Sequence, residues 1–161
     1  MSVSAALAQR GVRLAAAEDL EAIVDCVRAA YTVYVPRMGR EPAPMGADYA
    51  ELIGRGVVYV LPGPEGEGGS VRGVLVAYPL EGAFFIENVA VQPRYQGQGL
   101  GRRLLELAEA LARAAGFSEL RLYTNELMTE NLALYAHLGF AEYARGEEHG
   151  FHRVYLRKAV D

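Results

Sequence analysis

The chain has 161 residues, of which 52% are hydrophobic and 22% are charged, and its formal net charge is −4. These values are typical of one globular domain and exclude a disordered tail or a fibre. The acidic balance argues against general nucleic-acid binding, which needs a dense basic face. Cys26 is the only cysteine, so we expect neither an intramolecular disulfide nor a cysteine-based metal cluster.

Membrane and export signals are also missing from the sequence. No apolar run approaches the roughly 18 residues that a membrane-spanning helix needs. The N-terminal stretch lacks the basic-then-apolar layout of a signal peptide. We therefore expect a cytoplasmic protein with no membrane partner.

Hydrophobic periodicity predicts the elements in chain order. A short strand at Val12–Leu14 precedes a stretch, Glu18–Tyr34, whose apolar side chains recur mostly at helical spacing. Pro36, Pro42 and Pro44 are expected to break that helix. The later elements are predicted as a helix at Asp48–Gly54, strands at Val57–Leu61, Val71–Leu80 and Ala83–Val91, a helix from Leu100 to near Gly116, a strand at Leu120–Thr124, a helix at Thr129–Leu138, and a hairpin of Phe140–Arg145 with Phe151–Arg157.

This order of elements predicts the fold class. It is that of a mixed α/β (α+β) fold with antiparallel strands first, and no linker divides residues 1–161 into two domains. The stretch Pro62–Ser70, rich in glycine and proline, lies between two predicted strands. We expect it to be a mobile hairpin loop.

A glycine-rich segment follows the strand Ala83–Val91 and opens the long helix. Its alternate glycines let backbone N–H groups approach a bulky anion, and a helix N-terminus adds unpaired N–H groups and partial positive charge. Arg102 and Arg103 in the first turn oppose the helix dipole unless an anion lies nearby. The spacing fits neither a dinucleotide-binding fingerprint nor a P-loop. The alternatives are therefore a phosphate cradle of another kind and a plain glycine-rich turn.

Two motifs resemble those of the Gcn5-related N-acetyltransferase (GNAT) superfamily. The first is Val91-Gln92-Pro93 followed by Gln96-Gly97-Gln98-Gly99-Leu100-Gly101, and the second is Leu134-Tyr135-Ala136-His137-Leu138-Gly139-Phe140. The resemblance covers nearly the whole chain. It implies a central, mostly antiparallel sheet of six to seven strands, splayed in the middle and flanked by about four helices.

The resemblance also implies acetyl-CoA as cosubstrate and places its binding site. Backbone groups of Val89, Ala90 and Val91 would bind the pantetheine. The pyrophosphate would lie on the glycine segment, which comprises Gln96, Gly97, Gln98, Gly99, Leu100, Gly101 and Arg102. Helical spacing, and not the resemblance, suggests Asn131: it lies four residues before Tyr135 on the same face and could reach the cofactor, although a small residue is usual there in the family. The sequence departs from the family at Met128, where an asparagine is common.

Two residues are predicted to be catalytic. Glu87 stands in an apolar strand, where a carboxylate is costly unless it is paired, and strand alternation predicts that it shares a face with Val89 and Val91. It would deprotonate the amine; the alternative is a structural Glu87 bonded to Arg121 or Arg153. By the resemblance, Tyr135 would protonate the departing thiolate; the alternative is an interior aromatic that only packs.

The acceptor pocket is expected between the first two helices and the last hairpin. Tyr34, Arg37 and Arg40 lie in a proline-stiffened stretch, where an arginine would hold a carboxylate, or else would be solvated on a surface loop. Tyr123 and Asn125 follow the fifth strand and are expected beside the cleft. The three histidines are scattered, so no metal site is predicted.

The function predicted is transfer of acetyl from acetyl-CoA to the primary amine of a small molecule, by direct attack in a ternary complex. Two alternatives stay open: a protein or peptide amine as acceptor, and a non-catalytic module that senses acetyl-CoA. A homodimer is possible by the resemblance, because members of the superfamily are often homodimers.

Overall fold

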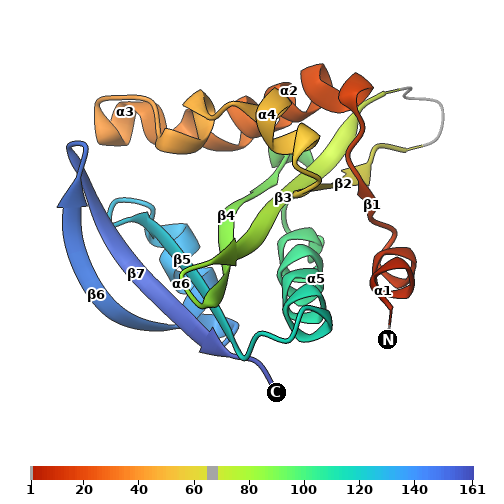
Figure 1. Cartoon of the computed structure of the whole chain (residues 1–161). Helices are drawn as coiled ribbons and strands as arrows, with labels where there is room; N and C mark the ends of the chain where they lie inside the picture. Colours follow the sequence, from red (N-terminus) through yellow and green to blue (C-terminus); the bar gives the residue numbers. More distant parts are fainter. Residues whose placement is uncertain (1, 65–68) are drawn as a thin grey trace.

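The computed structural model describes residues 2–64 and 69–161, and its centre is one seven-stranded sheet (Figure 1). The strand order is β1-β2-β3-β4-β5-β7-β6, and every neighbouring pair is antiparallel except β4 and β5. This confirms the predicted fold class. The strands are β1 (Arg13–Leu14), β2 (Val58–Pro62), β3 (Val71–Leu80), β4 (Ala83–Val91), β5 (Glu119–Asn125), β6 (Ala141–Glu148) and β7 (Phe151–Ala159).

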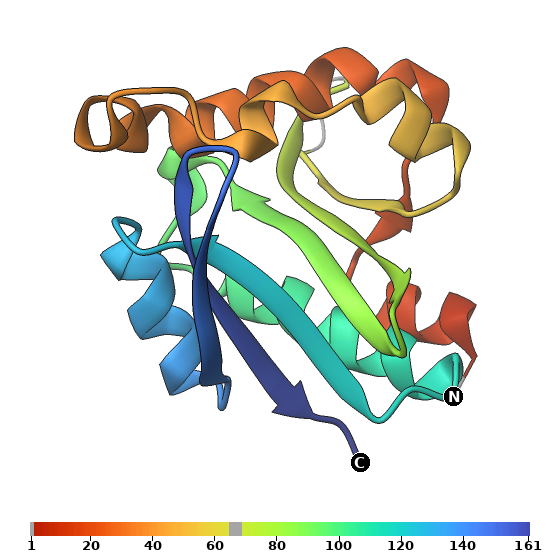
Figure 2. The same ribbon diagram turned by 60° about the vertical axis from the view of Figure 1, so that its left-hand side comes forward.

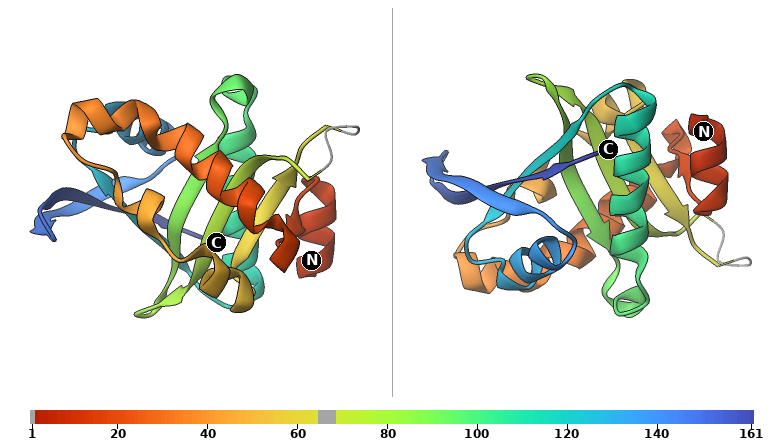
Figure 3. Two further views of the ribbon diagram at one scale, coloured as in Figure 1. Left: turned by 90° about the horizontal axis from the view of Figure 1, so that it is seen from above. Right: turned by 90° about the horizontal axis from the view of Figure 1, so that it is seen from below.

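Helices cover both faces of the sheet (Figure 3). They are α1 (Val3–Gln9), α2 (Leu20–Tyr31), α3 (Val35–Met38), α4 (Tyr49–Gly54), α5 (Leu100–Ala114) and α6 (Thr129–His137). One buried cluster joins α5 to the sheet, and a second joins α2 and α4 to the opposite face. None of the helices in the described ranges combines the length and the apolar character that crossing a bilayer requires.

Two local expectations were wrong. The helix α1 was not predicted, because it is only seven residues long and buries a single side chain, Ala6. The helical path also does not break at Pro36. It runs from α2 through a 3-10 turn into α3, and Pro36 lies in the first turn of α3. An N–H in the first turn of a helix has no intrahelical acceptor, so proline costs no hydrogen bond there. The path ends at Gly39, whose φ of 74° is left-handed.

The hairpin between β2 and β3 is confirmed, since Pro62 pairs with Val71 in antiparallel register. The expected mobility of this loop falls on a stretch whose residues 65–68 lie outside the described part of the chain.

The splay of the sheet lies between β4 and β5. These parallel strands pair only at Phe84 with Leu120 and at Phe85 with Arg121, near their starts. Beyond that point they diverge, as Figure 2 shows. The gap between their C-terminal halves is filled by side chains, and it is where the candidate site lies.

A row of aromatic rings crosses the sheet strand by strand. It consists of Tyr78 on β3, Phe85 on β4, Tyr123 on β5, Tyr155 on β7 and Tyr143 on β6. Successive ring centroids are 5.7, 5.7, 5.8 and 6.3 Å apart. We call this row the aromatic ladder. Its outer end, Tyr143, is 41% exposed.

Candidate active site between two splayed strands

Two hollows meet at the splay. The glycine-loop hollow, of about 550 Å³, lies against the start of α5, and the hairpin hollow, of about 230 Å³, lies against the β6–β7 hairpin. Four residues line both hollows: Tyr31, Val89, Asn131 and Tyr135. A ligand in either hollow therefore touches the same wall, which is the arrangement that transfer of a group between two ligands requires.

The glycine-loop hollow collects the predicted cofactor-binding residues. Of that set, only Gln98 does not line it; those that do are Val89, Ala90, Val91, Gln96, Gly97, Gly99, Leu100, Gly101, Arg102 and Asn131.

Backbone conformation explains why this segment needs glycine. Gly97 and Gly99 have φ values of 81° and 78°, which L side chains rarely adopt, although a Cβ at either position would meet no atom within 4 Å. Gly99 is the N-cap of α5, and the first intrahelical bond there runs from Arg103 N to Gly99 O at 3.0 Å. The amides of the three preceding residues have no intrahelical acceptor, so they can bind an anion.

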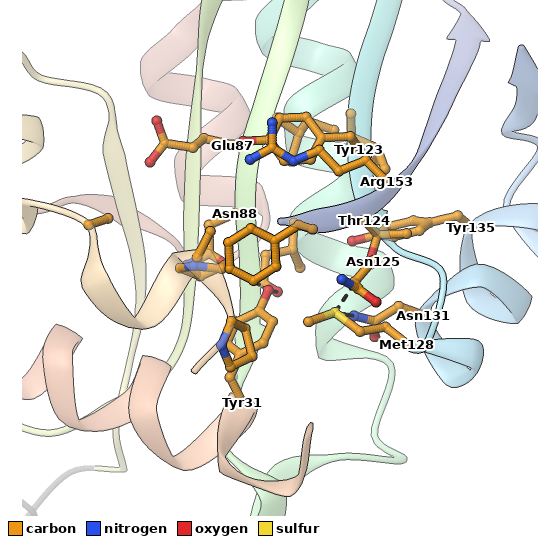
Figure 4. A pocket seen from close by; sticks show the side chains of 18 of the residues that line it. Tyr31, Glu87, Asn88, Tyr123, Thr124, Asn125, Met128, Asn131, Tyr135 and Arg153 are labelled. Carbon is orange, nitrogen blue, oxygen red and sulfur yellow. Dashed lines mark hydrogen bonds between the residues drawn. The ribbon is translucent and has the colours of Figure 1, made fainter. Parts of the chain in front are cut away.

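Tyr135 lies on α6 and lines both hollows, and Figure 4 shows its side chain beside Thr124 in the hairpin hollow. The residue is 7% exposed, and its ring packs edge-on against Phe140 with centroids 5.6 Å apart. Burial raises the pKa of the Tyr135 hydroxyl well above its usual range. The hydroxyl carries its proton near neutral pH, as an ordinary tyrosine also does, so it can serve as a proton donor.

Glu87 lies at an irregularity of β4. The pairing with β3 shifts at this point, so Val76 pairs with Asn88 while Ala77 pairs with Ile86, and Glu87 is the extra residue. Val89 and Val91 pack against the α5 cluster, whereas Glu87 bonds to Tyr78, which packs against the α2 cluster. The expectation that Glu87 shares a face with Val89 and Val91 was therefore wrong, because the bulge resets the alternation.

The Glu87 carboxylate also has a different partner from the one expected in its structural alternative. It accepts a 2.6 Å hydrogen bond from the Tyr78 hydroxyl, while Arg121 pairs with Glu119 and Arg153 pairs with Glu148. Glu87 lines the hairpin hollow, and its carboxylate points away from Arg153 (Figure 4).

A buried polar network holds the bulge, and sequence reasoning missed it. Asn88 is 4% exposed; its Oδ1 accepts from the Tyr31 hydroxyl at 2.7 Å, and its Nδ2 donates to the Tyr49 hydroxyl oxygen at 3.0 Å. The Tyr31 hydroxyl also approaches Val89 O at 3.1 Å. These bonds tie β4 to α2 and α4. An amide in an apolar strand was the signal that could have revealed it.

The predicted acceptor-side residues divide among three places. Tyr123 and Asn125 line the hairpin hollow, as expected. Tyr34 and Arg37 line the glycine-loop hollow instead. Arg37 Nη1 donates to Leu127 O and to Glu130, each at 3.0 Å.

Arg40 lines neither of these hollows and fastens the loop after α3 to the hairpin. Its guanidinium lies 3.9 Å from the centre of the Phe151 ring, and its Nη1 donates to His149 O at 3.0 Å. The structure therefore places neither Arg37 nor Arg40 in the wall of the hairpin hollow. The arginine that does line the hairpin hollow is Arg153, which was not predicted.

Within residues 2–64 and 69–161, no three His, Cys, Asp or Glu side chains are placed to hold a metal ion. Burial raises the pKa of the Cys26 thiol to about 12, so it is a poor nucleophile near neutral pH.

Comparison with known proteins agrees with this geometry. The family model described as "Acetyltransferase (GNAT) family" matches residues 27–140. An IAA acetyltransferase of Azospirillum brasilense is 43% identical over 68 residues, and the mouse N-alpha-acetyltransferase 80 is 45% identical over 58 residues. The matched stretches are 42% and 36% of this chain, but only 44% and 17% of those two relatives.

Solved structures match over almost the whole chain. The PaiA N-acetyltransferase of Thermoplasma acidophilum, solved with coenzyme A, has a TM-score of 0.75 at 16% identity, covering 92% of this chain and 97% of that one. An IAA acetyltransferase of Bacillus cereus has a TM-score of 0.65 at 25% identity, with the same coverage of both chains.

Proposed function

This chain belongs to the acetyltransferase (GNAT) family, and from that premise we propose that it transfers acetyl from acetyl-CoA to the primary amine of a small molecule. The observation that carries the proposal is the wall shared by the two hollows, with Tyr135 and Asn131 in it. Acetyl-CoA would bind in the glycine-loop hollow and the acceptor amine in the hairpin hollow.

The glycine-loop hollow has the features that coenzyme A needs. Free amides at the start of α5, left-handed Gly97 and Gly99, and the nearby Arg102 guanidinium suit a pyrophosphate. Backbone groups of Val89 and Val91 on the splayed edge of β4 would hold the pantetheine arm. When bound, the cosubstrate supplies an acetyl group activated as a thioester.

Two side chains of this protein would then move protons. Glu87 would accept a proton from the acceptor ammonium, directly or through water, because an alkyl ammonium with a pKa of about 10.4 is almost fully charged near neutral pH. The Tyr135 hydroxyl would donate its proton to the departing sulfur. Attack within the ternary complex needs no covalent enzyme intermediate.

The roof of the hairpin hollow favours a small acceptor over a protein. Pro42, Ala43 and Pro44 of the loop after α3 line the hollow, and Arg40 fastens this loop to the hairpin. A peptide would need an open groove at that place. The cytoplasmic location and the homodimer remain predictions.

Release of coenzyme A from acetyl-CoA, measured against amino acids, polyamines, aminoglycosides and short peptides, tests the proposal. We expect turnover with one class of amine and a fall in kcat of about 100-fold in Tyr135→Phe, since a general acid is lost while the ring still packs. Tyr59→Phe is the matched control, because Tyr59 is half-buried on β2 and lines neither hollow.

Two results of this assay would contradict the proposal. Turnover confined to peptides would replace the small-molecule acceptor. Binding of acetyl-CoA, seen as a thermal shift, with no coenzyme A released in the presence of any amine would support the sensor alternative. The chain has a single lysine, Lys158, so acetylation of the enzyme itself adds little background.

A further inference from the structure

We infer that Arg153 binds a carboxylate of the acceptor, so that the substrate is an amine with an apolar body and an anionic end. The inference rests on the proposed function, since it names the acceptor of that same site. Arginine side chains are mostly exposed to solvent, so a nearly buried arginine in the wall of a hollow is unusual.

Arg153 is held rigidly in the wall of the hairpin hollow. Its side chain is only 11% exposed, and its guanidinium lies 4.1 Å from the centre of the Tyr123 ring. Stacking fixes the plane of the guanidinium, which carries five N–H donors in a fork that matches a carboxylate. A guanidinium that is pre-oriented in this way loses little freedom when it binds an anion.

The partner of Arg153 lies on the solvent side. Arg153 Nη1 donates to Glu148 Oε2 at 2.5 Å, and the Glu148 side chain is 55% exposed at the end of β6. Glu148 does not line the hairpin hollow. The Tyr155 hydroxyl also donates to Glu148, at 3.0 Å, so Glu148 keeps a partner when a ligand carboxylate takes its place at Arg153.

The rest of the hairpin hollow defines the other parts of the ligand. Its only charged lining residues are Glu87 and Arg153, and they do not pair with each other. Much of the remaining lining is apolar and includes Met38, Pro42, Ile86, Leu122, Met128 and Phe151. Arg153 does not line the glycine-loop hollow, whereas Tyr135 lines both. An acceptor with its amine at Tyr135 would therefore extend its far end toward Arg153.

Two variants separate recognition from a structural role. If Arg153 only secures the hairpin through Glu148, removal of either partner harms the protein in the same way. If Glu148 is a stand-in for the acceptor carboxylate, Arg153→Met and Glu148→Gln change the use of an anionic acceptor in opposite directions. Arg153→Lys keeps the charge without the planar fork and should recover only part of the loss.

The probes are 4-(aminomethyl)benzoate and its neutral isostere 4-(aminomethyl)benzamide. We expect wild type to prefer the carboxylate in kcat/KM, and Arg153→Met to lower kcat/KM for that probe roughly 30-fold, as expected when a charged hydrogen bond is lost, with little change for the amide. Glu148→Gln should raise kcat/KM for the carboxylate alone. Equal use of both probes by wild type, or an equal fall for both in Arg153→Met, would overturn the inference.

A binding measurement keeps this test apart from the proposed function. Calorimetric titration with 4-methylbenzoate and 4-methylbenzamide, neither of which carries an amine, needs no turnover. Tighter binding of the benzoate by wild type, lost in Arg153→Met at an unchanged Tm, supports the inference even if no amine is acetylated. Equal or undetectable binding of the two probes by wild type overturns it, even if other amines are acetylated.

Discussion

Glu87 is a carboxylate at a bulge, with one defined hydrogen bond from Tyr78 and a position in the wall of the hairpin hollow. Replacing it with Gln keeps the shape and removes the proton acceptor. We expect Glu87→Gln to lower kcat/KM near neutral pH by about 100-fold. The deficit should shrink as the pH rises toward the pKa of the amine, because more of the acceptor is then neutral without help.

A pH profile of kcat/KM in wild type and Glu87→Gln is the measurement. Glu21→Gln, an exposed change on α2, is the control for loss of one negative charge. Full activity of Glu87→Gln at every pH would remove Glu87 from the base role and leave a water chain or another group as the acceptor of the proton.

At the scale of elements, the start of α5 depends on one backbone conformation. Gly99 is left-handed, so Gly99→Ala should destabilise the fold by about 1 kcal/mol and distort the amides that follow it. Gly101 is helical, and a Cβ there would meet Leu134 and Val91 at 3.8 and 3.9 Å, which is ordinary contact.

The matched pair therefore separates conformation from bulk. We expect Gly99→Ala to weaken coenzyme A binding about tenfold, equivalent to about 1.4 kcal/mol, and Gly101→Ala to leave Tm nearly unchanged and to weaken binding less. Thermal unfolding and calorimetry give the two numbers. Equal weakening by both variants would mean that the ligand approaches the Cα atoms more closely than the loop geometry indicates.

The junction of β1 with α2 carries a pH-dependent contribution to stability. Arg13 donates to both oxygens of the buried Asp19 at 2.7 and 2.9 Å, and the amide of Ala16 donates to the same carboxylate. The hydrogen bond from Arg13 lowers the pKa of Asp19 in the folded chain, more than burial raises it. The stabilisation is therefore present above the unfolded-state value of about 3.9 and is lost as the pH falls through the lower folded value.

Asp19→Asn should lower the free energy of unfolding by about 2 kcal/mol at neutral pH, since it leaves Arg13 without its partner. The variant and wild type should converge as the pH falls from about 4 through the lower folded pKa of Asp19, because the wild-type carboxyl then also becomes neutral. Urea unfolding across pH measures this, with the exposed Asp25→Asn on α2 as the control. A difference that stays constant down to the lowest pH would exclude the charge as its cause.

Over the whole molecule, the sequence predicts most of the architecture and part of the lining of the two hollows. The periodic strands, the long α5 and the glycine segment are local patterns, so they were visible along the chain. Glu87 was assigned to the wrong face because a bulge depends on register with β3, which no local pattern contains. Arg153 was missed because its position follows from the pairing of β7 with β5, which brings it against Tyr123.

The aromatic ladder gives the molecule an optical property. The sequence has ten tyrosines and no tryptophan, so tyrosine dominates the ultraviolet emission. Tyr123, Tyr155 and Tyr143 have neighbouring centroids 5.8 and 6.3 Å apart, which is close enough for excitation to migrate from ring to ring before it is emitted. A molecule bound against Tyr123 in the hairpin hollow should therefore also change the fluorescence of Tyr155 and Tyr143, which it does not touch. Binding in the hollow can then be followed by the intrinsic tyrosine fluorescence of the unlabelled chain.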